Sequence, residues 1–208
     1  DMSACYHKHF DVIYSCMSAA LRLEDTVPEA DFWHTYGIPD GTRIAIFQGS
    51  MTALRNLDNL ARATRYLEDD CRLVVVGGGD YQEKFLHTLE KEGNPERVVM
   101  VGWVNQSELL RFTVNADLGV LPYSAVDEYY SYAVPNKLME YFEATLPMLY
   151  DVSMKEVSMV AGEHGVGVGE DLSDPVKFGQ TLNRLLHDEE QLLRHEKAVR
   201  GLPEQVQL

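Results

Sequence analysis

The sequence predicts an α/β fold, a Rossmann-like doubly wound parallel sheet of about six strands, and two observations carry this prediction. First, about six short apolar runs recur between residues 43 and 168, and most of them lack polar alternation. Such runs are typical of strands that helices cover on both faces of a parallel sheet. Second, patterns with helical spacing separate these runs, and alternating units of this length favour right-handed crossovers.

Residues 1–40 form the least regular part of the chain. Residues 10–23 fit a strand followed by a helix, but no periodicity continues past Glu24. Asp40 and Gly41 together indicate a turn. We therefore expect a remnant of an N-terminal domain or a linker over residues 1–40, one Rossmann-like domain over 41–200 and a tail over 201–208.

From Arg43 onward the predicted elements alternate regularly. The predicted strands share aliphatic and β-branched residues and cover residues 43–47, 73–76, 98–101, 118–121, 147–150 and 166–168. Two stripes with helical spacing follow the first two strands, formed by Leu54, Leu57, Ala61 and Leu67 and by Phe85, Leu86 and Leu89. Asn105 with Glu108 resembles a capping box, and Asp174 before Pro175 indicates another helix start.

The composition excludes several classes of function. A formal net charge of -15 over 208 residues opposes binding to nucleic acid or to an anionic membrane. The cysteines Cys5, Cys16 and Cys71 are widely spaced without a CxxC pattern, so neither a disulfide framework nor a zinc ribbon is expected. The sequence has neither a run of about 18 apolar residues nor a signal-peptide pattern. We therefore expect a cytoplasmic protein without a transmembrane segment.

Ligands of open α/β sheets bind outside the carboxyl ends of the strands, so the residues after each strand are candidates for a site. Glycine follows the first three predicted strands, in Gln48-Gly49-Ser50, in Gly77-Gly78-Gly79 and in Gly102-Trp103-Val104. Glycine lets a ligand approach the backbone closely. A triple glycine alone is more typical of a tight turn, whereas several such strand ends beside basic residues indicate a ligand site.

A tyrosine-rich loop leads from the fourth predicted strand to a predicted helix start at Pro135. Proline suits the first helical position, which would leave the amides of Asn136, Lys137 and Leu138 open. With the helix dipole and the Lys137 ammonium, these amides predict a pocket for an anion such as a diphosphate. Glu140 lies three residues further along the same helical face, where its carboxylate can accept hydrogen bonds from ribose hydroxyls. The alternative is an ordinary solvated Lys–Glu pair on an amphipathic helix.

Residues 36–200 resemble the C-terminal, nucleotide-sugar-binding domain of retaining GT-B glycosyltransferases of the glycosyl transferases group 1 family. The matching motifs stand in the family's order: residues 44–50 with 55–57, 73–79, 99–104, 117–122, and 135–141 followed by Leu146-Pro147. The resemblance implies a hexosyl- or related transferase that retains configuration, uses no metal ion and no cofactor, and takes a UDP- or GDP-linked sugar as donor. It leaves the catalytic residues unknown.

The resemblance also implies roles for individual residues. The donor diphosphate would contact Gly49, Ser50, Arg55, Asn136 and Lys137, and the ribose would contact Glu140. Gly102, Trp103 and Val104 would flank the base, and the donor sugar would contact Tyr132, Ala133, Val134 and Pro135. Three residues depart from the family pattern: Tyr132 replaces the first glutamate of a pair, Ser50 a basic residue and Asn56 a glycine. We expect Lys137 to supply part of the missing positive charge.

A complete enzyme of this family has two Rossmann-like domains, and residues 1–40 are too few to form the acceptor-binding one. We therefore expect the chain to need a missing N-terminal domain or a partner subunit, and to be inactive in transfer alone. A noncatalytic nucleotide-binding or regulatory module of the same fold is the alternative, and a sugar-nucleotide epimerase is a third possibility without a positive feature. His7 and His9 lack a third metal ligand nearby, and Ser50 and Ser124 lack the context of a hydrolase nucleophile.

Overall fold

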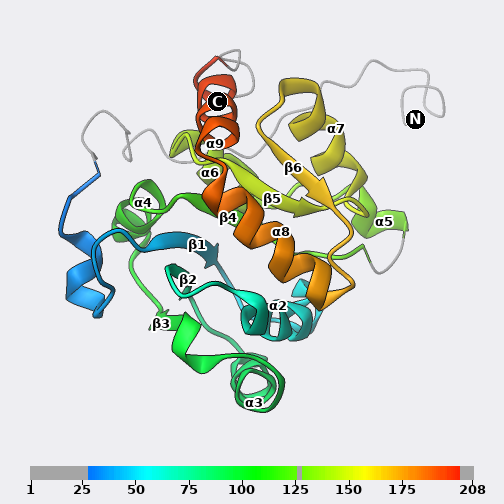
Figure 1. Ribbon diagram of the computed structural model, residues 1–208. Coiled ribbons are helices and arrows are strands. Elements are labelled where there is room, and N and C mark those ends of the chain that lie inside the picture. The colour runs from blue at the N-terminus through cyan, green and yellow to red at the C-terminus, as the bar shows by residue number, and fades with distance from the viewer. Residues whose placement is uncertain (1–27, 126–127, 202–208) are drawn as a thin grey trace, which may run out of the picture.

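The computed structural model describes residues 28–125 and 128–201, which contain one six-stranded parallel sheet (Figure 1). The strands run in the order β3-β2-β1-β4-β5-β6, the order of a doubly wound Rossmann fold. Their bounds are β1 (Arg43–Gln48), β2 (Cys71–Val76), β3 (Val98–Gly102), β4 (Leu118–Leu121), β5 (Met148–Asp151) and β6 (Gly167–Glu170). The predicted fold class is confirmed, and each predicted strand coincides with an observed one to within two residues.

Helices cover both faces of the sheet. The α-helices are α2 (Leu57–Ala63), α3 (Gln82–Glu92), α4 (Gln106–Val114), α5 (Glu128–Ser131), α6 (Asn136–Glu143), α7 (Lys155–His164), α8 (Pro175–His187) and α9 (Glu189–Arg200). Helix α2 packs between α3 and α8, and α8 contacts β1, so these three helices form one layer (Figure 1). Helix α6 packs against α4 and β4, while α7 packs against β5 and β6. None of the helices in the described ranges has the length and apolar character that a membrane span requires.

Helix α6 is anchored to the centre of the sheet by Tyr141, whose side chain is fully buried. Its hydroxyl lies 3.1 Å from the carbonyl of Ile46 in β1 and 3.3 Å from that of Val120 in β4. Gly119 makes room for the ring, because a Cβ there would lie 2.7 Å from the Tyr141 ring. Burial of a side chain of this size stabilises the fold by roughly 2–3 kcal/mol. The position of the α6 N-terminus relative to the strand ends is therefore fixed by the core.

The prediction of one continuous helical stripe from Leu54 to Leu67 is wrong. The chain breaks at Asn56, which has a φ of 51° and separates the short 3-10 helix η3 (Ala53–Arg55) from α2. Asparagine tolerates this left-handed conformation better than most residues, and its Nδ2 donates to the Leu172 carbonyl at 3.1 Å. The break leaves Arg55 at the end of η3, outside the packed helix and beside the strand ends.

The predicted local signals are found where the structure describes them. Asp174 caps α8 by accepting from the amide of Val176 at 2.9 Å, with Pro175 as the first helical residue. Asn105 precedes α4, and its amide donates to the Glu108 carboxylate at 3.4 Å.

The chain before β1 packs on the domain from residue 29 onward. Short 3-10 helices also occur at η2 (Phe32–Tyr36), η4 (Thr64–Tyr66) and η5 (Pro95–Arg97). The Phe32 ring in η2 lies 5.1 Å from the Phe112 ring of α4, and Trp33 Nε1 donates to the Asn115 carbonyl at 2.6 Å. The strand and helix predicted over residues 10–23, together with the His7 and His9 pair, lie outside the described residues.

Candidate functional site

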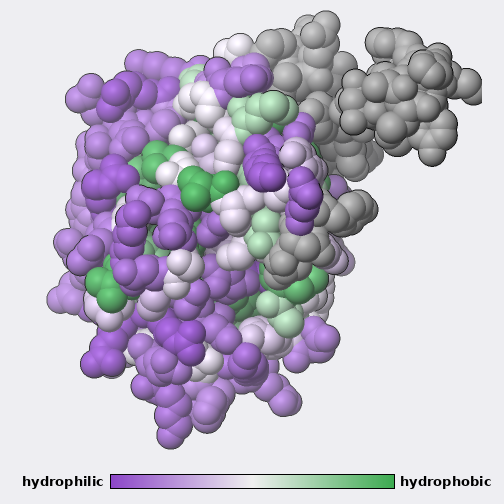
Figure 2. Space-filling view, turned by 90° about the vertical axis from the view of Figure 1, so that its right-hand side faces the viewer, coloured by the Kyte–Doolittle hydropathy of each residue, from purple (hydrophilic) through white to green (hydrophobic). Residues whose placement is uncertain are grey.

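A hollow of about 520 Å³ opens at the carboxyl ends of the strands. Residues from the loops after β1, β3, β4 and β5 line it: Gly49, Ser50, Thr52, Leu54, Arg55, Trp103, Tyr123, Ser124, Tyr130, Ala133, Val134, Pro135, Asn136, Lys137 and Met154. Figure 2 views the molecule from the side towards which β1 points in Figure 1, and apolar patches interrupt a mainly hydrophilic surface there. Loops distant in sequence thus converge at the edge where this fold binds ligands.

Glycines bring the backbones of the β1 and β2 loops together beneath this hollow. Gly49 and Gly77 have φ values of 131° and 130°, and a Cβ at Gly77 would lie 2.1 Å from the Gly49 carbonyl oxygen. A Cβ at Gly79 would lie 2.4 Å from the Met51 carbonyl oxygen. The triple glycine does not line the hollow itself. Its role is structural, because Gly77 and Gly79 allow the β2 loop to pack against the backbone of the β1 loop.

The N-terminus of α6 faces the hollow, one residue later than predicted. Pro135 is the residue before the helix, with φ −71° and ψ 141°, and its carbonyl accepts from the Leu138 amide at 2.9 Å. The prediction of an open Leu138 amide is therefore wrong, because the first turn already uses it. The amides of Asn136 and Lys137 donate to no group in residues 28–125 and 128–201. These two open donors at the positive end of the helix suit an anion.

Lys137 and Glu140 form a largely buried ion pair. The Lys137 ammonium lies 2.6 Å from Glu140 Oε1 and 2.7 Å from Oε2, and the Glu140 residue is only 7% exposed. The alternative of a solvated surface pair is therefore wrong. Gln48, the last residue of β1, also donates to Glu140 Oε2, at 2.6 Å. Sequence reasoning missed Gln48, although a glutamine that ends an otherwise apolar strand was the available signal.

Arg55 reaches the hollow from the loop after β1. Its guanidinium carbon lies 3.9 Å from the centroid of the Tyr123 ring, in a cation–π arrangement. Burial raises the pKa of the Tyr123 phenol to about 12, so the ring is neutral at physiological pH. Within the described residues Arg55 makes no ion pair, and its charge is uncompensated by a carboxylate. The loops therefore hold a cation beside the α6 N-terminus.

The structure gathers most, but not all, of the predicted site residues. Gly102, Val104, Glu140 and Tyr132 lie outside the residues that line the hollow, and Trp103 stands at its rim with 69% of its surface exposed. The Tyr132 ring lies 5.1 Å from the Lys155 ammonium of α7. Lining residues that sequence reasoning did not select are Thr52, Leu54, Tyr123, Ser124, Tyr130 and Met154.

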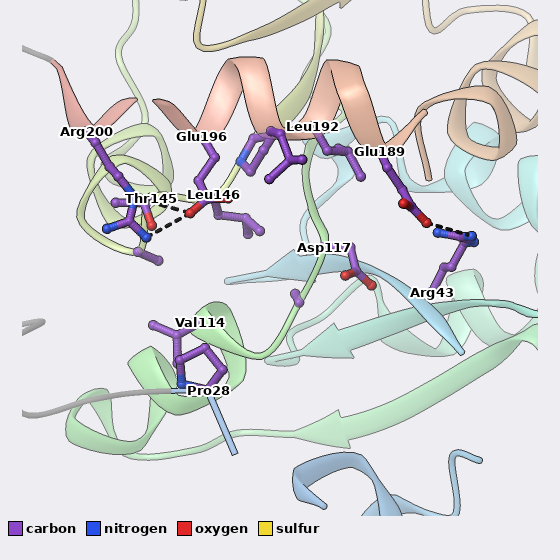
Figure 3. Close-up of a pocket in the computed structure, with 14 residues that line it drawn as sticks. Pro28, Arg43, Val114, Asp117, Thr145, Leu146, Glu189, Leu192, Glu196 and Arg200 are labelled. Atoms are coloured by element: carbon purple, nitrogen blue, oxygen red, sulfur yellow. Dashed lines mark hydrogen bonds and ion pairs between the residues drawn. The ribbon is translucent and has the colours of Figure 1, made fainter. Parts of the chain in front are cut away.

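A larger hollow, of about 700 Å³, lies at the opposite edge of the sheet, between α9 and the segments that lead into β1, β4 and β5 (Figure 3). Figure 3 shows Glu189 directed towards Arg43 and Glu196 towards Arg200. These are ion pairs at 3.4 Å and 2.7 Å. None of the predicted site residues lines this hollow. Its charged groups largely compensate one another, so it is a weaker candidate for an anionic ligand.

Two clusters of possible metal ligands occur among the described residues, and neither lines the 520 Å³ hollow. One consists of Asp31, His34 and Asp40, all exposed, and the other of Asp70, Cys71 and His187. Burial and the neighbouring Asp70 raise the pKa of the Cys71 thiol to about 12. Burial therefore disfavours the thiolate of Cys71, which is the form that binds metals.

The structure resembles several solved glycosyltransferases. The structure resembles WaaG, a glycosyltransferase involved in lipopolysaccharide biosynthesis (TM-score 0.72, 19% identity, 95% of this chain and 54% of that chain). It also resembles Anabaena Alr3699/HepE in complex with UDP-glucose (0.73, 14%, 92% and 51%). A third similar structure is the C-terminal domain of LpcC, a glycosyl transferase group 1 family protein from Francisella tularensis (0.65, 14%, 86% and 93%). The chain thus spans about half the length of the first two enzymes and most of the isolated domain.

Sequence comparison agrees with the structural one. The uncharacterized glycosyltransferase MJ1607 of Methanocaldococcus jannaschii is 29% identical over 94 residues, which cover 44% of this chain and 24% of that protein. The family described as "Glycosyl transferases group 1" matches residues 32–201, most of the chain. The chain therefore belongs to the glycosyl transferases group 1 family, as its motifs and its fold both indicate.

Proposed function

We propose that this chain is the donor-binding half of a retaining, metal-independent glycosyltransferase, and that its donor is a UDP-linked sugar. One observation carries the proposal: Ser50, Arg55, Asn136 and Lys137 converge on one hollow, with the carboxylate of Glu140 beneath it. The complexes of a similar structure with UDP and with UDP-glucose support UDP over GDP as the nucleotide. Retention rests on the family resemblance.

The diphosphate is bound by the open α6 amides and two cations. Arg55 and Lys137 line the same hollow, although the protein as a whole carries a formal charge of -15. An ammonium has three donor hydrogens, so Lys137 can hold both Glu140 oxygens and still donate to a phosphate oxygen. Charge-assisted hydrogen bonds of this kind are about twice as strong as neutral ones. These groups supply the positive charge at the leaving diphosphate in the proposed metal-independent reaction.

The ribose is bound by Glu140. Its carboxylate can accept about four hydrogen bonds, and Gln48 and Lys137 supply three of them. The remaining position is open to a ribose hydroxyl. Trp103 at the rim is placed to flank the base.

Transfer requires an acceptor-binding domain in addition to these residues, from a longer chain or from a partner subunit. The chain spans about half of the similar glycosyltransferases, and positioning an acceptor against the donor accounts for a large part of catalysis. We therefore expect this chain alone to bind the donor without transferring the sugar. Turnover of UDP-glucose by this chain alone at an ordinary enzymatic rate would show that no second domain is needed.

Calorimetric titration with UDP and with GDP tests the donor site. We expect UDP to bind, and Arg55→Ala and Glu140→Ala each to weaken binding by roughly tenfold or more, because each removes a charged contact. Arg62→Ala is the matched control, since Arg62 pairs with Glu92 away from the hollow. If neither UDP nor GDP gives binding heat, the proposal is overturned. It is also overturned if Arg62→Ala weakens UDP binding as much as Arg55→Ala and Glu140→Ala do.

A noncatalytic nucleotide-binding module of the same fold is the second candidate. Tyr132, which stands where the resemblance expects a glutamate, lies outside the lining residues and beside Lys155. Both candidates bind UDP, but only the first turns over a UDP-sugar when an acceptor-binding domain is present. A measurement of UDP release by the two-domain protein distinguishes them.

A further inference from the structure

Gln48 is a polar residue in the apolar centre of the sheet. It ends β1, where its neighbours Ile46 and Phe47 have no exposed surface, and is itself 1% exposed. A buried carboxamide that lacks hydrogen-bond partners costs about 1–3 kcal/mol. Its presence therefore depends on the partners that it meets there.

Those partners fix the orientation of the carboxamide. Nε2 lies 2.6 Å from Glu140 Oε2, and Oε1 lies 2.9 Å from the hydroxyl of Thr113 in α4. An ionised carboxylate only accepts hydrogen bonds, so the NH₂ group must face Glu140 and Oε1 must face Thr113. The Thr113 hydroxyl also lies 2.9 Å from the Leu109 carbonyl, and its single proton serves these two acceptors. Thr113 is 1% exposed, so water does not compete for it.

This arrangement joins the proposed ribose contact to the proposed phosphate loop. Gln48 immediately precedes Gly49 and Ser50, which line the hollow, and its side chain holds one oxygen of Glu140 from below. We infer that Gln48 is a positioning residue: together with Thr113 it directs the Glu140 carboxylate towards the ribose hydroxyls of a nucleoside diphosphate. This inference rests on the proposed nucleotide site.

The ligand itself separates positioning from simple core packing. UDP carries the ribose hydroxyls and 2′,3′-dideoxy-UDP lacks them, so the ratio of their dissociation constants measures the Glu140 contact. In the unaltered protein we expect UDP to bind at least roughly tenfold more tightly than 2′,3′-dideoxy-UDP, so that the ratio of the dideoxy-UDP constant to the UDP constant is about ten or more. In Gln48→Met, which keeps the length of the side chain but removes its donor, UDP affinity falls until the ratio approaches one. The affinity for the dideoxy nucleotide stays the same. Calorimetry at one salt concentration gives both constants.

Thr113 provides a second pair of variants if Gln48→Met does not fold. Thr113→Val removes the hydroxyl at nearly constant shape, and we expect the ratio to fall by roughly threefold, because the carboxamide loses one of its two anchors. Thr113→Ser keeps the hydroxyl and restores the ratio.

The outcomes distinguish the inference from the proposed function. If Gln48→Met and Thr113→Val leave the ratio unchanged, or weaken both nucleotides equally, Gln48 only fills space and the inference is wrong, while the donor site stands. If the unaltered protein binds neither UDP nor GDP, the proposed function itself fails. If it binds GDP alone, the same ratios are measured with GDP and 2′,3′-dideoxy-GDP.

Discussion

The sheet has a hollow at each edge, and the two hollows differ in what their polar groups contact. At the amino ends of the strands, Arg43 donates to the Leu186 carbonyl at 3.0 Å and pairs with Glu189, and Arg200 pairs with Glu196. At the carboxyl ends, the Asn136 and Lys137 amides have no acceptor in the described ranges, and the charge of Arg55 lies against an aromatic ring. In this sense the amino-end edge is largely closed, although Arg43 Nε is buried without a hydrogen-bond partner among the described residues, and the carboxyl-end edge is open.

Volume alone would favour the amino-end edge over the edge of the proposed site. The amino-end hollow measures about 700 Å³ and the carboxyl-end hollow about 520 Å³. Polar groups that already bond to one another contribute to stability and gain little from a ligand, whereas open donors gain a full set of contacts. The difference teaches that the open backbone donors of Asn136 and Lys137, and not size, favour the carboxyl-end hollow as the proposed nucleotide site.

The largest expected effect concerns the glycines. At the carboxyl ends, Gly77→Ala would place a Cβ 2.1 Å from the Gly49 carbonyl at a φ of 130°, and we expect a loss of roughly 3 kcal/mol or more in the free energy of unfolding. At the amino ends, Gly41→Ala meets no atom within 4 Å at a φ of 75°, so only backbone strain of about 1 kcal/mol is expected. Urea denaturation of both variants measures the difference. Equal losses would mean that the two loops at the carboxyl edge are not packed as closely as described.

A smaller effect tests the open amides directly. Asn136→Pro removes the amide at the first position of α6, where proline is compatible with a helix, as Pro175 shows at the start of α8. Because no described group accepts from that amide, we expect unchanged or slightly higher stability and roughly tenfold weaker UDP binding. Calorimetry and urea denaturation measure the two quantities.

Asn136→Ala is the matched control, because it keeps the amide and removes only the side chain. If Asn136→Pro and Asn136→Ala bind UDP equally well, the α6 amide contributes nothing to the site. The distinction between an open and a closed edge would then lose its main support.

Local patterns predicted the elements of this fold well, because apolar runs and caps act over a few residues. The six strands, the Asp174 cap and the helix that begins beside Pro135 all followed from neighbouring residues. The break at Asn56 did not, since the spacing of Leu54 and Leu57 says nothing about the backbone between them. The side chain at the break donates to the carbonyl of Leu172, which is 116 residues away.

The contacts around the proposed site were predicted only in part, for the same physical reason. Gln48 meets Glu140 across 92 positions and Thr113 across 65, so no window of the sequence contains the network. The stacking of Arg55 on Tyr123 joins two loops that look unrelated in the sequence. The contact between the Tyr132 ring and Lys155 of α7 was likewise not predicted from the sequence, and the expected contact of Tyr132 with the donor sugar stays a prediction.

The smallest expected effect is at the amino-end edge, where His187 links the end of α8 to the start of β2. Its Nδ1 lies 2.8 Å from the Asn183 carbonyl, and its Nε2 lies 3.1 Å from Asp70 Oδ2 and 3.8 Å from Glu68. The carbonyl first, and then Asp70, raise the pKa of His187 above its ordinary value of 6.5. Arg43, 3.6 Å from Asp70, competes for the same carboxylate.

A raised histidine pKa stabilises the fold below pH 6.5, and the contribution disappears as pH rises through the folded-state pKa. The His187–Asp70 pair is partly exposed, so its contribution to stability is small. Between about pH 6 and about pH 8.5 we expect the free energy of unfolding of the unaltered protein to fall by no more than about 1 kcal/mol relative to that of His187→Gln. UDP affinity should be the same in both proteins, since His187 is absent from the lining of the carboxyl-end hollow. If the free energies of unfolding of the unaltered protein and of His187→Gln change in parallel with pH, the contact between His187 and Asp70 does not stabilise the fold. A change in UDP affinity would mean that the two edges are coupled, against the separation of roles inferred from their contacts.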